Sequence, residues 1–269
     1  MFCRVLLVCA LFGAAPVSAH AGAFLQPPEH GQIISQLSFS EAGRAWDAYG
    51  RAVPIPAWRK FELTSYAEYG LTDWLTIIGS PSWFRFHAPA PRPSNWFGPV
   101  GSQDLSRVGA AQTGARVRLF EIGDHVVSVQ ASARYAGGGG DSVAYADMSR
   151  RMQVDLRIAY GRKFEWMGLS GYTDMQVAFR SAGVFGNQIR FDATLAVQPF
   201  ARTTLMLQSF SVLTPGRLGG SYALSQKLQT SVLLDVTETV ALQAGALVAL
   251  RGVRSAAERG LVTGVWYRF

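Results

Sequence analysis

The chain ends in the stretch that decides its fold, Gly260-Leu-Val-Thr-Gly-Val-Trp-Tyr-Arg-Phe269. Side chains on a β-strand alternate between the two faces of a sheet. One face therefore carries Leu261, Thr263, Val265, Tyr267 and Phe269. The opposite face carries Gly260, Val262, Gly264, Trp266 and Arg268. We predict that this stretch is a strand with a mostly apolar face, closed by an aromatic residue at the carboxyl terminus.

The same alternation recurs along the chain. It is clearest in Arg151–Tyr160, Gln188–Pro199, Val127–Tyr135 and Lys227–Asp235, where apolar residues alternate with charged or polar ones. Segments of about ten residues with this pattern are typical of transmembrane β-strands. A soluble β-sandwich alternates too, with its polar face outside, so the alternation alone does not tell inside from outside. The amino terminus, the terminal Phe269 and the aromatic residues at strand ends favour a membrane barrel.

The amino terminus resembles a signal peptide. Met1–Arg4 is a short basic region, and an apolar stretch over 5–15 follows it. The next residues offer cleavage after Ala19 or after Ala21. Both cysteines, Cys3 and Cys9, fall inside this segment, so the mature chain is expected to contain no disulfide. We predict a signal peptide over 1–21 and one barrel domain over 22–269.

The composition agrees with a barrel. Charged residues make up 16% of the chain, against about 25% in an ordinary soluble domain. Hydrophobic residues make up 49%, yet no apolar run beyond the signal segment is long enough for a transmembrane helix. The net charge of +7 then has to reside in the lumen or in the loops.

Short polar links and longer Gly/Pro-rich links divide the chain into about twelve strands. The short links follow Tyr69, Phe120, Tyr160, Pro199 and Asp235. The long links are 42–57, 87–106, 137–147, 182–187, 213–224 and 252–259. The strands are expected at 32–41, 58–69, 74–86, 107–120, 126–136, 148–160, 166–181, 188–199, 204–212, 225–235, 240–251 and 260–269. We predict an all-β, antiparallel up-and-down transmembrane barrel with both termini in the periplasm.

A proline within one expected strand and a short stretch within one long link affect the strand assignment. Pro81 lies inside the strand expected at 74–86 and predicts a bulge, because proline removes a ladder hydrogen bond. Residues 218–223 could form an extra short strand, but this would make the strand number odd, so a loop is expected there.

The alternation also predicts which charged residues face the lumen. The inward basic residues are Lys60, Arg116, Arg118, Arg134, Arg151, Arg157, Arg180, Arg190, Lys227, Arg251 and Arg268. The inward acidic residues are Glu62, Glu68, Asp155, Asp174, Asp192 and Asp235. A barrel of about twelve strands encloses a narrow lumen, and an excess of positive charge there favours anions or polar solutes. Alternatively, these residues form cross-strand ladders that brace the wall and contact no solute.

Aromatic residues gather at one end of the first strands. They are Trp46, Tyr49, Trp58, Trp83, Phe84, Phe86, Trp96 and Phe97. A membrane-interface girdle explains such a group. An aromatic entry site for a hydrophobic solute would explain it as well.

Enzymatic, metal and nucleic-acid functions find no support in the sequence. The histidines are His20, His30, His87 and His125, and none is expected in mid-strand beside a serine on the outer face. The chain has no Gly-x-Ser-x-Gly motif, no metal-binding histidine pair and no Gly-rich phosphate loop before a helix. Its basic residues are spread along strands rather than gathered in one patch. We expect neither catalysis, nor a cofactor, nor a nucleic-acid partner.

At family level the chain resembles bacterial outer-membrane β-barrels over nearly its whole length. Tyr267 and Phe269 resemble the carboxyl-terminal assembly signal of such proteins, which implies contact with the barrel-assembly machinery and with outer-membrane lipid. The unit Phe61-Glu-Leu-Thr-Ser-Tyr-Ala-Glu-Tyr-Gly-Leu-Thr-Asp-Trp-Leu-Thr76 also resembles channels of the phenol-degradation meta-pathway family. That resemblance implies passage of small hydrophobic aromatic compounds, which fits less well with a basic lumen.

The sequence therefore predicts a passive outer-membrane channel for small solutes, either anionic or polar ones or small aromatic ones. A structural or adhesive barrel without an open pore and an outer-membrane lipid-modifying enzyme are the alternatives from other functional classes.

Overall fold

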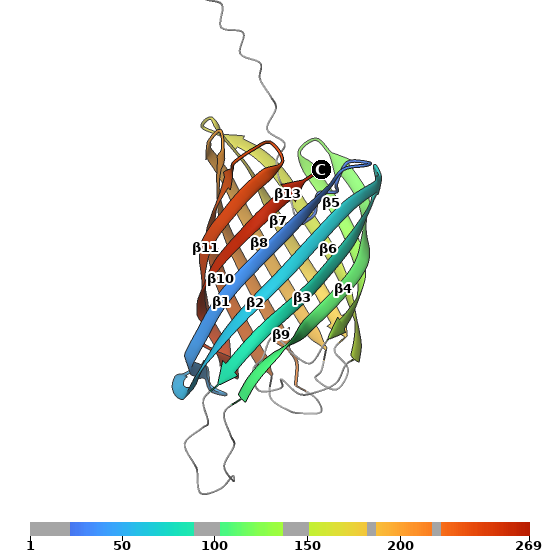
Figure 1. Cartoon of the computed structure of the whole chain (residues 1–269). Helices are drawn as coiled ribbons and strands as arrows, with labels where there is room; N and C mark the ends of the chain where they lie inside the picture. Colours follow the sequence, from blue (N-terminus) through green and yellow to red (C-terminus); the bar gives the residue numbers. More distant parts are fainter. Residues whose placement is uncertain (1–21, 89–102, 137–150, 182–186, 217–221) are drawn as a thin grey trace, which may run out of the picture.

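The structure is a computed structural model that describes residues 22–88, 103–136, 151–181, 187–216 and 222–269. Twelve long antiparallel strands form a closed barrel in this part of the chain, and one two-residue strand is added to it (Figure 1). The long strands are β1 (Gly31–Trp46), β2 (Ala52–Thr72), β3 (Leu75–Ala88), β4 (Gln103–Ile122), β5 (His125–Ala136), β6 (Arg151–Trp166), β7 (Leu169–Ser181), β8 (Gln188–Phe200), β9 (Thr203–Thr214), β10 (Ala223–Asp235), β11 (Val240–Val253) and β13 (Arg259–Arg268). The short strand is β12 (Ser255–Ala256). This confirms the predicted fold class and strand number.

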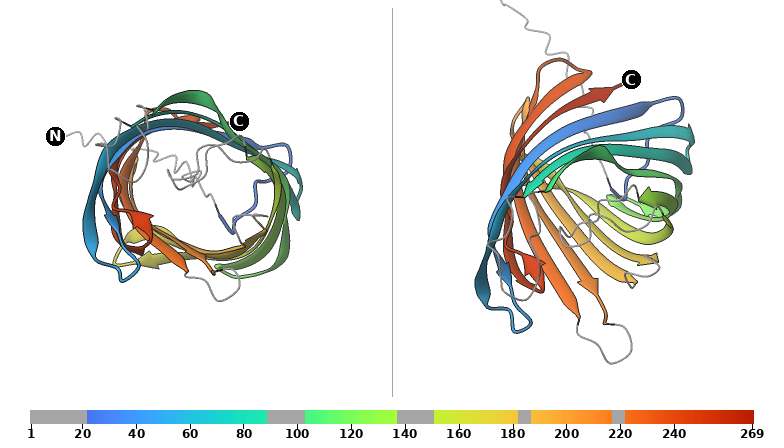
Figure 2. Two further views of the ribbon diagram at one scale, coloured as in Figure 1. Left: turned by 90° about the horizontal axis from the view of Figure 1, so that it is seen from below. Right: turned by 60° about the horizontal axis from the view of Figure 1, so that its bottom comes forward.

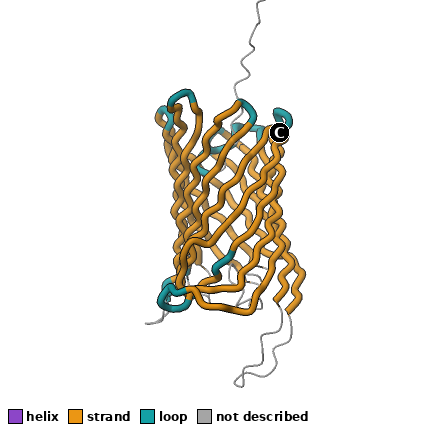
Figure 3. Tube along the Cα trace, turned by 90° about the vertical axis from the view of Figure 1, so that its left-hand side faces the viewer, coloured by secondary structure: helices purple, strands orange, loops and turns teal. Residues whose placement is uncertain are grey.

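The two ends of the barrel differ. The tight connections β2–β3, β4–β5, β6–β7, β8–β9 and β10–β11 lie at one end together with the carboxyl terminus, which we call the turn end (Figures 1 and 3). The opposite end, which we call the loop end, carries the β1–β2 hairpin, and β3, β5, β7 and β9 end there. Short turns therefore alternate with longer links, as the sequence predicts.

The barrel closes through pairing of β1 with β13. Their register runs from Gln32 opposite Arg268 to Glu41 opposite Arg259. Phe269 extends this seam, because its N–H donates to the Gly31 carbonyl at 3.0 Å and its carbonyl accepts from the Gly31 N–H at 2.8 Å. The Phe269 ring also stacks with Tyr69 and Tyr267, at centroid distances of 6.4 and 5.8 Å. The terminal aromatic is thus part of the closing contact.

The wall is apolar outside and polar inside. On the outer face Leu156 and Ile158 are 53% and 60% exposed. On the inner face Ser128 and Asp155 are completely buried. The outer surface suits lipid, whereas the interior consists largely of hydrogen-bonding side chains.

Two predicted links contain strand residues in the structure. The link expected over 42–57 is mostly strand, because β1 and β2 pair up to Trp46 and Ala52, with a register shift between Ala42 and Arg44. Only the turn around Asp47 connects them. The backbone N–H of Arg51 donates to the Asp47 carboxylate at 2.9 Å, and this bond lowers the pKa of that carboxyl group. Within the link expected over 252–259, β12 pairs with the end of β1.

The turn expected directly after Tyr160 was also misplaced. β6 continues to Trp166, because Arg162 pairs with His125 of β5. The turn is made by Met167 and Gly168, with φ angles of 52° and 76°. Two consecutive positive φ angles are the geometry of a type I′ hairpin turn. The irregularity predicted at Pro81 is confirmed by a register shift between β3 and β4 directly after it.

Two further types of feature are missing in the described part of the chain. No helix there has the length and hydropathy needed to cross a membrane. Nor do its His, Cys, Asp and Glu residues form a group of three that could bind a metal ion.

Candidate functional site

Residues 22–30, which we call the inner segment, lie inside the ring of strands (Figure 2). The segment enters at the turn end, where it runs alongside the end of β2. The Glu29 N–H donates to the Gly70 carbonyl at 3.0 Å, and the Gly70 N–H donates to the His30 carbonyl at 2.9 Å. A Cβ at Gly70 would collide with the carbonyls of Gln26 and Pro27. Glycine at this position therefore allows the segment to lie directly against the wall.

Phe24 anchors the inner segment in an apolar layer of the lumen. It is 6% exposed, and its ring meets Tyr172 edge to face at a centroid distance of 5.9 Å. The ammonium group of Lys163 lies 5.5 Å from the centre of the Phe24 ring, which is cation–π distance. A Cβ at Gly161 would lie 2.8 Å from the Phe24 ring atoms, so this glycine makes room for the ring. The other members of the layer are Ile34, Val126, Ala196, Met206, Leu233, Ala241 and Trp266.

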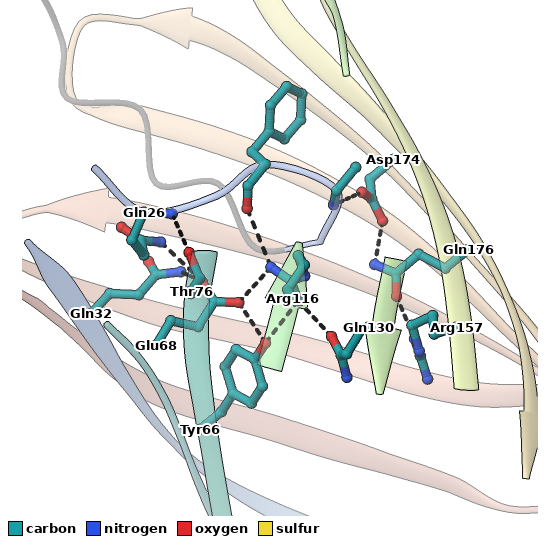
Figure 4. A network of polar contacts seen from close by, with 12 residues as sticks. Gln26, Gln32, Tyr66, Glu68, Thr76, Arg116, Gln130, Arg157, Asp174 and Gln176 are labelled. Atoms are coloured by element: carbon teal, nitrogen blue, oxygen red, sulfur yellow. Dashed lines mark hydrogen bonds and ion pairs between the residues drawn. The ribbon is translucent and has the colours of Figure 1, made fainter. Parts of the chain in front are cut away.

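A buried ion pair holds the backbone of the inner segment from the β4 side (Figure 4). Arg116 of β4 is 3% exposed and pairs with Glu68 of β2 at 2.8 Å. The same guanidinium donates to the Phe24 carbonyl at 3.2 Å, to the Tyr66 hydroxyl at 3.0 Å and to the Gln130 amide oxygen at 2.9 Å. Arg116 therefore links the inner segment to three strands at once.

The Glu68 carboxylate is saturated with donors. In addition to Arg116, it accepts from the Tyr66 hydroxyl at 2.5 Å, the Gln32 amide at 3.0 Å and the Gln26 amide at 2.9 Å. Gln26 belongs to the inner segment, and its backbone N–H donates to the Thr76 hydroxyl at 3.1 Å. A buried charge is tolerated when it is both paired and hydrogen-bonded. Through Gln26, the inner segment donates one of the hydrogen bonds that stabilise the buried Glu68 carboxylate.

Asp174 of β7 holds the other end of the inner segment. Its carboxylate, 2% exposed, accepts from the Ala23 N–H at 2.5 Å and from the Gln176 amide at 2.5 Å. Gln176 in turn accepts from Arg157. The inner segment is thus held at two successive residues, by Arg116 of β4 at the Phe24 carbonyl and by Asp174 of β7 at the Ala23 N–H (Figure 4).

A charged ladder continues from Arg157 toward the loop end. Arg157 pairs with Asp192 at 2.9 Å, and Asp155 pairs with Arg180 at 3.0 Å. Lys60 and Glu62 form another inward pair, at 2.9 Å. These residues fit the alternative that lumen charges brace the wall through cross-strand contacts.

The structure places most of the predicted lumen residues on the inner face. Arg116, Asp155, Asp174 and Arg180 are buried there. Those on the inner face with partly exposed side chains are Lys60, Glu62, Arg118, Arg134, Arg157, Arg190 and Asp192. Arg118 pairs with Glu121 near the turn end. Arg151 begins β6, and its side chain lies outside the described residues.

Arg251 was predicted to line the lumen, and that prediction was wrong. It lies opposite Gln226 of β10, whereas the next residue, Lys227, lies opposite Ala249. The extra residue, Leu250, is a β-bulge that reverses the alternation beyond it. Cross-strand partners share a face, so Arg251 lies with Gln226 on the outer side, and its guanidinium donates to that amide at 2.7 Å.

Sequence reasoning missed the inner segment and two charged groups beside the lumen. The sequence predicts Lys163 in a turn, but the alternation of β6 places it on the inner face. The sequence predicts Glu258 in a loop, yet it is 6% exposed and pairs with Lys227. For the inner segment the only local signal was a run without alternation, and such a run does not show that the chain turns inward.

The aromatic group at the loop end divides between the two faces. Trp58, Phe84 and Phe86 lie on the inner side and pack together, each at most 5% exposed. Trp83 is 40% exposed on the outer face, and Tyr49 lies exposed in the β1–β2 turn. Trp96 and Phe97 lie outside the described residues. The outward members fit an interface girdle, and the inward ones form a small core.

Comparison with known proteins identifies the fold. No protein-family model and no curated protein matches the sequence. Among solved structures, an outer-membrane channel from Pseudomonas putida F1 is similar with a TM-score of 0.67 and 14% identity, over 94% of this chain and 100% of that one. The NanC porin is similar with a TM-score of 0.52 and 8% identity, over 86% of this chain and 98% of that one. The chain therefore has the fold of bacterial outer-membrane β-barrels.

Proposed function

We propose that the protein is an outer-membrane channel through which small solutes pass passively. The observation that carries this proposal is the closed barrel with an apolar outer face and a charged inner face. The likeness of the fold to an outer-membrane channel and to a porin supports it. In this proposal, both termini lie on the periplasmic side, lipid covers the outer face, and the barrel-assembly machinery recognises Tyr267 and Phe269.

The inner segment limits the size of the solute. It occupies part of the lumen at the turn end, and Phe24 fills an apolar layer there. Passage requires either a narrow path beside the segment or its displacement. Both favour small molecules over polymers.

Charge on the inner wall favours anions. Most inward carboxylates of the described residues pair with Arg or Lys, so they present little free negative charge. Arg134 of β5, by contrast, donates to the Gln153 amide oxygen at 2.9 Å and pairs with no carboxylate in the described part of the chain. Such a guanidinium near the loop end attracts anions by the same principle as charged rings in other channels.

A small aromatic solute is the second candidate. It is favoured by the inward Trp58, Phe84 and Phe86, which lie on the lumen side of the wall near the loop end. Each of the three side chains is buried against the others. A small aromatic anion would use both this cluster and the arginines.

Conductance in a planar bilayer under a salt gradient tests the proposal. We expect discrete steps and a reversal potential of anion-selective sign. Arg134→Glu should shift that reversal potential toward cation selectivity. Arg251→Glu is the matched control, because it makes the same charge change near the same end but on the outer face. A folded barrel that does not conduct would contradict the channel, and equal shifts for both variants would contradict the role of the lumen charge.

A further inference from the structure

We propose that Asp174 is the binding site for the α-ammonium group that signal-peptide cleavage after Ala21 creates on Gly22. This goes beyond passage of solutes and rests on export of the chain through its amino-terminal signal. It assigns both the cleavage position and the group that fixes the free end of the inner segment inside the lumen.

The geometry at Gly22 carries the assignment. A Cβ at this residue would collide with the carboxylate group of Asp174, so the Cα of Gly22 lies directly against that carboxylate. The next N–H, from Ala23, already donates to Oδ2 of Asp174 at 2.5 Å. The nitrogen of Gly22 is one bond from its Cα, and a free amine there can rotate toward the carboxylate without moving the inner segment.

The charge of Asp174 calls for such a partner. The carboxylate is 2% exposed and accepts two hydrogen bonds from neutral amides. No cationic side chain of the described residues forms an ion pair with it. Arg116 and Arg157 are the nearby cations, but they pair with Glu68 and Asp192. A buried carboxylate without a counter-ion is unfavourable, and an α-ammonium group provides the charge together with hydrogen-bond donors.

The sequence provides the matching cleavage site. Ala19-His-Ala21 is a small-x-small motif that ends directly before Gly22. Cleavage after Ala19 would leave His20 and Ala21 in front of Gly22, and the amine would then lie two residues away from Asp174. Only cleavage after Ala21 produces the ammonium group at the carboxylate.

The first test is the mass of the mature protein, purified from outer membranes of cells that express the full precursor. We expect a chain that begins at Gly22. A chain that begins at His20, or at any other residue, would overturn the proposal. Conductance does not enter this measurement, so its failure is distinguishable from failure of the channel function.

The second test is the rate at which an acylating reagent modifies the α-amine at neutral pH, followed by mass spectrometry of the amino-terminal peptide. An ion pair that raises the amine pKa by one unit leaves about tenfold less reactive free amine. We therefore expect the amine of the unmodified protein to react at least about tenfold more slowly than that of Asp174→Asn. Asp235→Asn is the control, because it removes a carboxylate at the same end that pairs with Arg268.

Gly22→Ala gives an independent variant if Asp174→Asn does not fold. The added Cβ collides with the Asp174 carboxylate, so the amine should be displaced and should react about as fast as in Asp174→Asn. Equal acylation rates in the unmodified protein and in the folded variants would show that the amine does not bind Asp174, and would overturn the assignment.

Discussion

Replacement of Phe24 by alanine tests whether the inner segment controls the lumen. Phe24 is the side chain that buries the segment in its apolar layer, with Tyr172 at its edge and Lys163 over its face. The variant removes these contacts and leaves every charged residue of the wall in place. Any change in conductance then reports the segment rather than the charge of the lumen.

The magnitude follows from burial. Phe24 is 6% exposed, and complete burial of a Phe side chain is worth roughly 1.5–3 kcal/mol. If the segment stayed in place, the cavity left by the ring would make the loss of free energy larger. The segment can instead move out of the lumen, so only the loss from burial, roughly 1.5–3 kcal/mol, applies. About 1.4 kcal/mol corresponds to a tenfold change in an equilibrium constant. The ratio of molecules with the inner segment bound in the lumen to molecules with it released should therefore fall roughly tenfold to a hundredfold.

Single-channel recording measures this ratio directly. We expect Phe24→Ala to show a larger mean conductance, or more frequent transitions to a higher level. Phe200→Ala is the control, because it also removes a Phe ring near the turn end, but one that is 72% exposed. If Phe24→Ala has the same conductance, the same noise and the same level occupancy as the control, the inner segment does not restrict passage and the reasoning is refuted.

Three further perturbations follow from the same contacts. Deletion of Phe269 removes two hydrogen bonds of the barrel seam, so outer-membrane assembly should fall while export continues, as fractionation with heat-modifiability gels would show; normal assembly would contradict it. Arg116→Met leaves Glu68 unpaired and should lower the free energy of unfolding by about 3–5 kcal/mol. Glu68→Gln in the same chain should restore part of that loss in urea titrations, and strictly additive losses would count against the coupling. Gly161→Leu should reproduce the conductance change of Phe24→Ala, because its side chain needs the space of the Phe24 ring; unchanged conductance would argue against that packing.

Strand alternation was sufficient to predict the barrel wall. In a wall with lipid outside and polar groups inside, odd and even positions along a strand face opposite sides. The face of each residue can therefore be predicted from the few residues around it. Arg116, Asp155 and Asp174 accordingly lie buried on the inner face. Arg251 was misplaced because one bulged residue, Leu250, reverses the parity, and a bulge in a strand of ordinary composition leaves no clear sequence signal. The turn at Met167 was misplaced for a similar reason, since the polar residues after Tyr160 continue the ladder.

The position of the inner segment in the lumen could not be predicted from strand alternation, because its contacts join residues far apart in sequence. Ala23 bonds to Asp174, and the Phe24 carbonyl bonds to Arg116. Nothing in the sequence next to Asp174 or Arg116 distinguishes either residue from the other charged residues that face the lumen. Even the glycines that make room for the segment, such as Gly161, resemble ordinary strand glycines until the segment is in place.

The charged contacts around the inner segment act mainly through position rather than net stability. A buried ion pair such as Arg116–Glu68 recovers about what its desolvation costs, so apolar residues of equal size could support the barrel as well. Apolar residues could not, however, present donors to the Phe24 carbonyl and acceptors to the Gln26 amide. Hydrogen bonds are directional, and these fix where the inner segment lies in the lumen. Barrel stability can therefore come largely from strand pairing and the lipid-facing residues, while the polar interior determines how much of the lumen remains open.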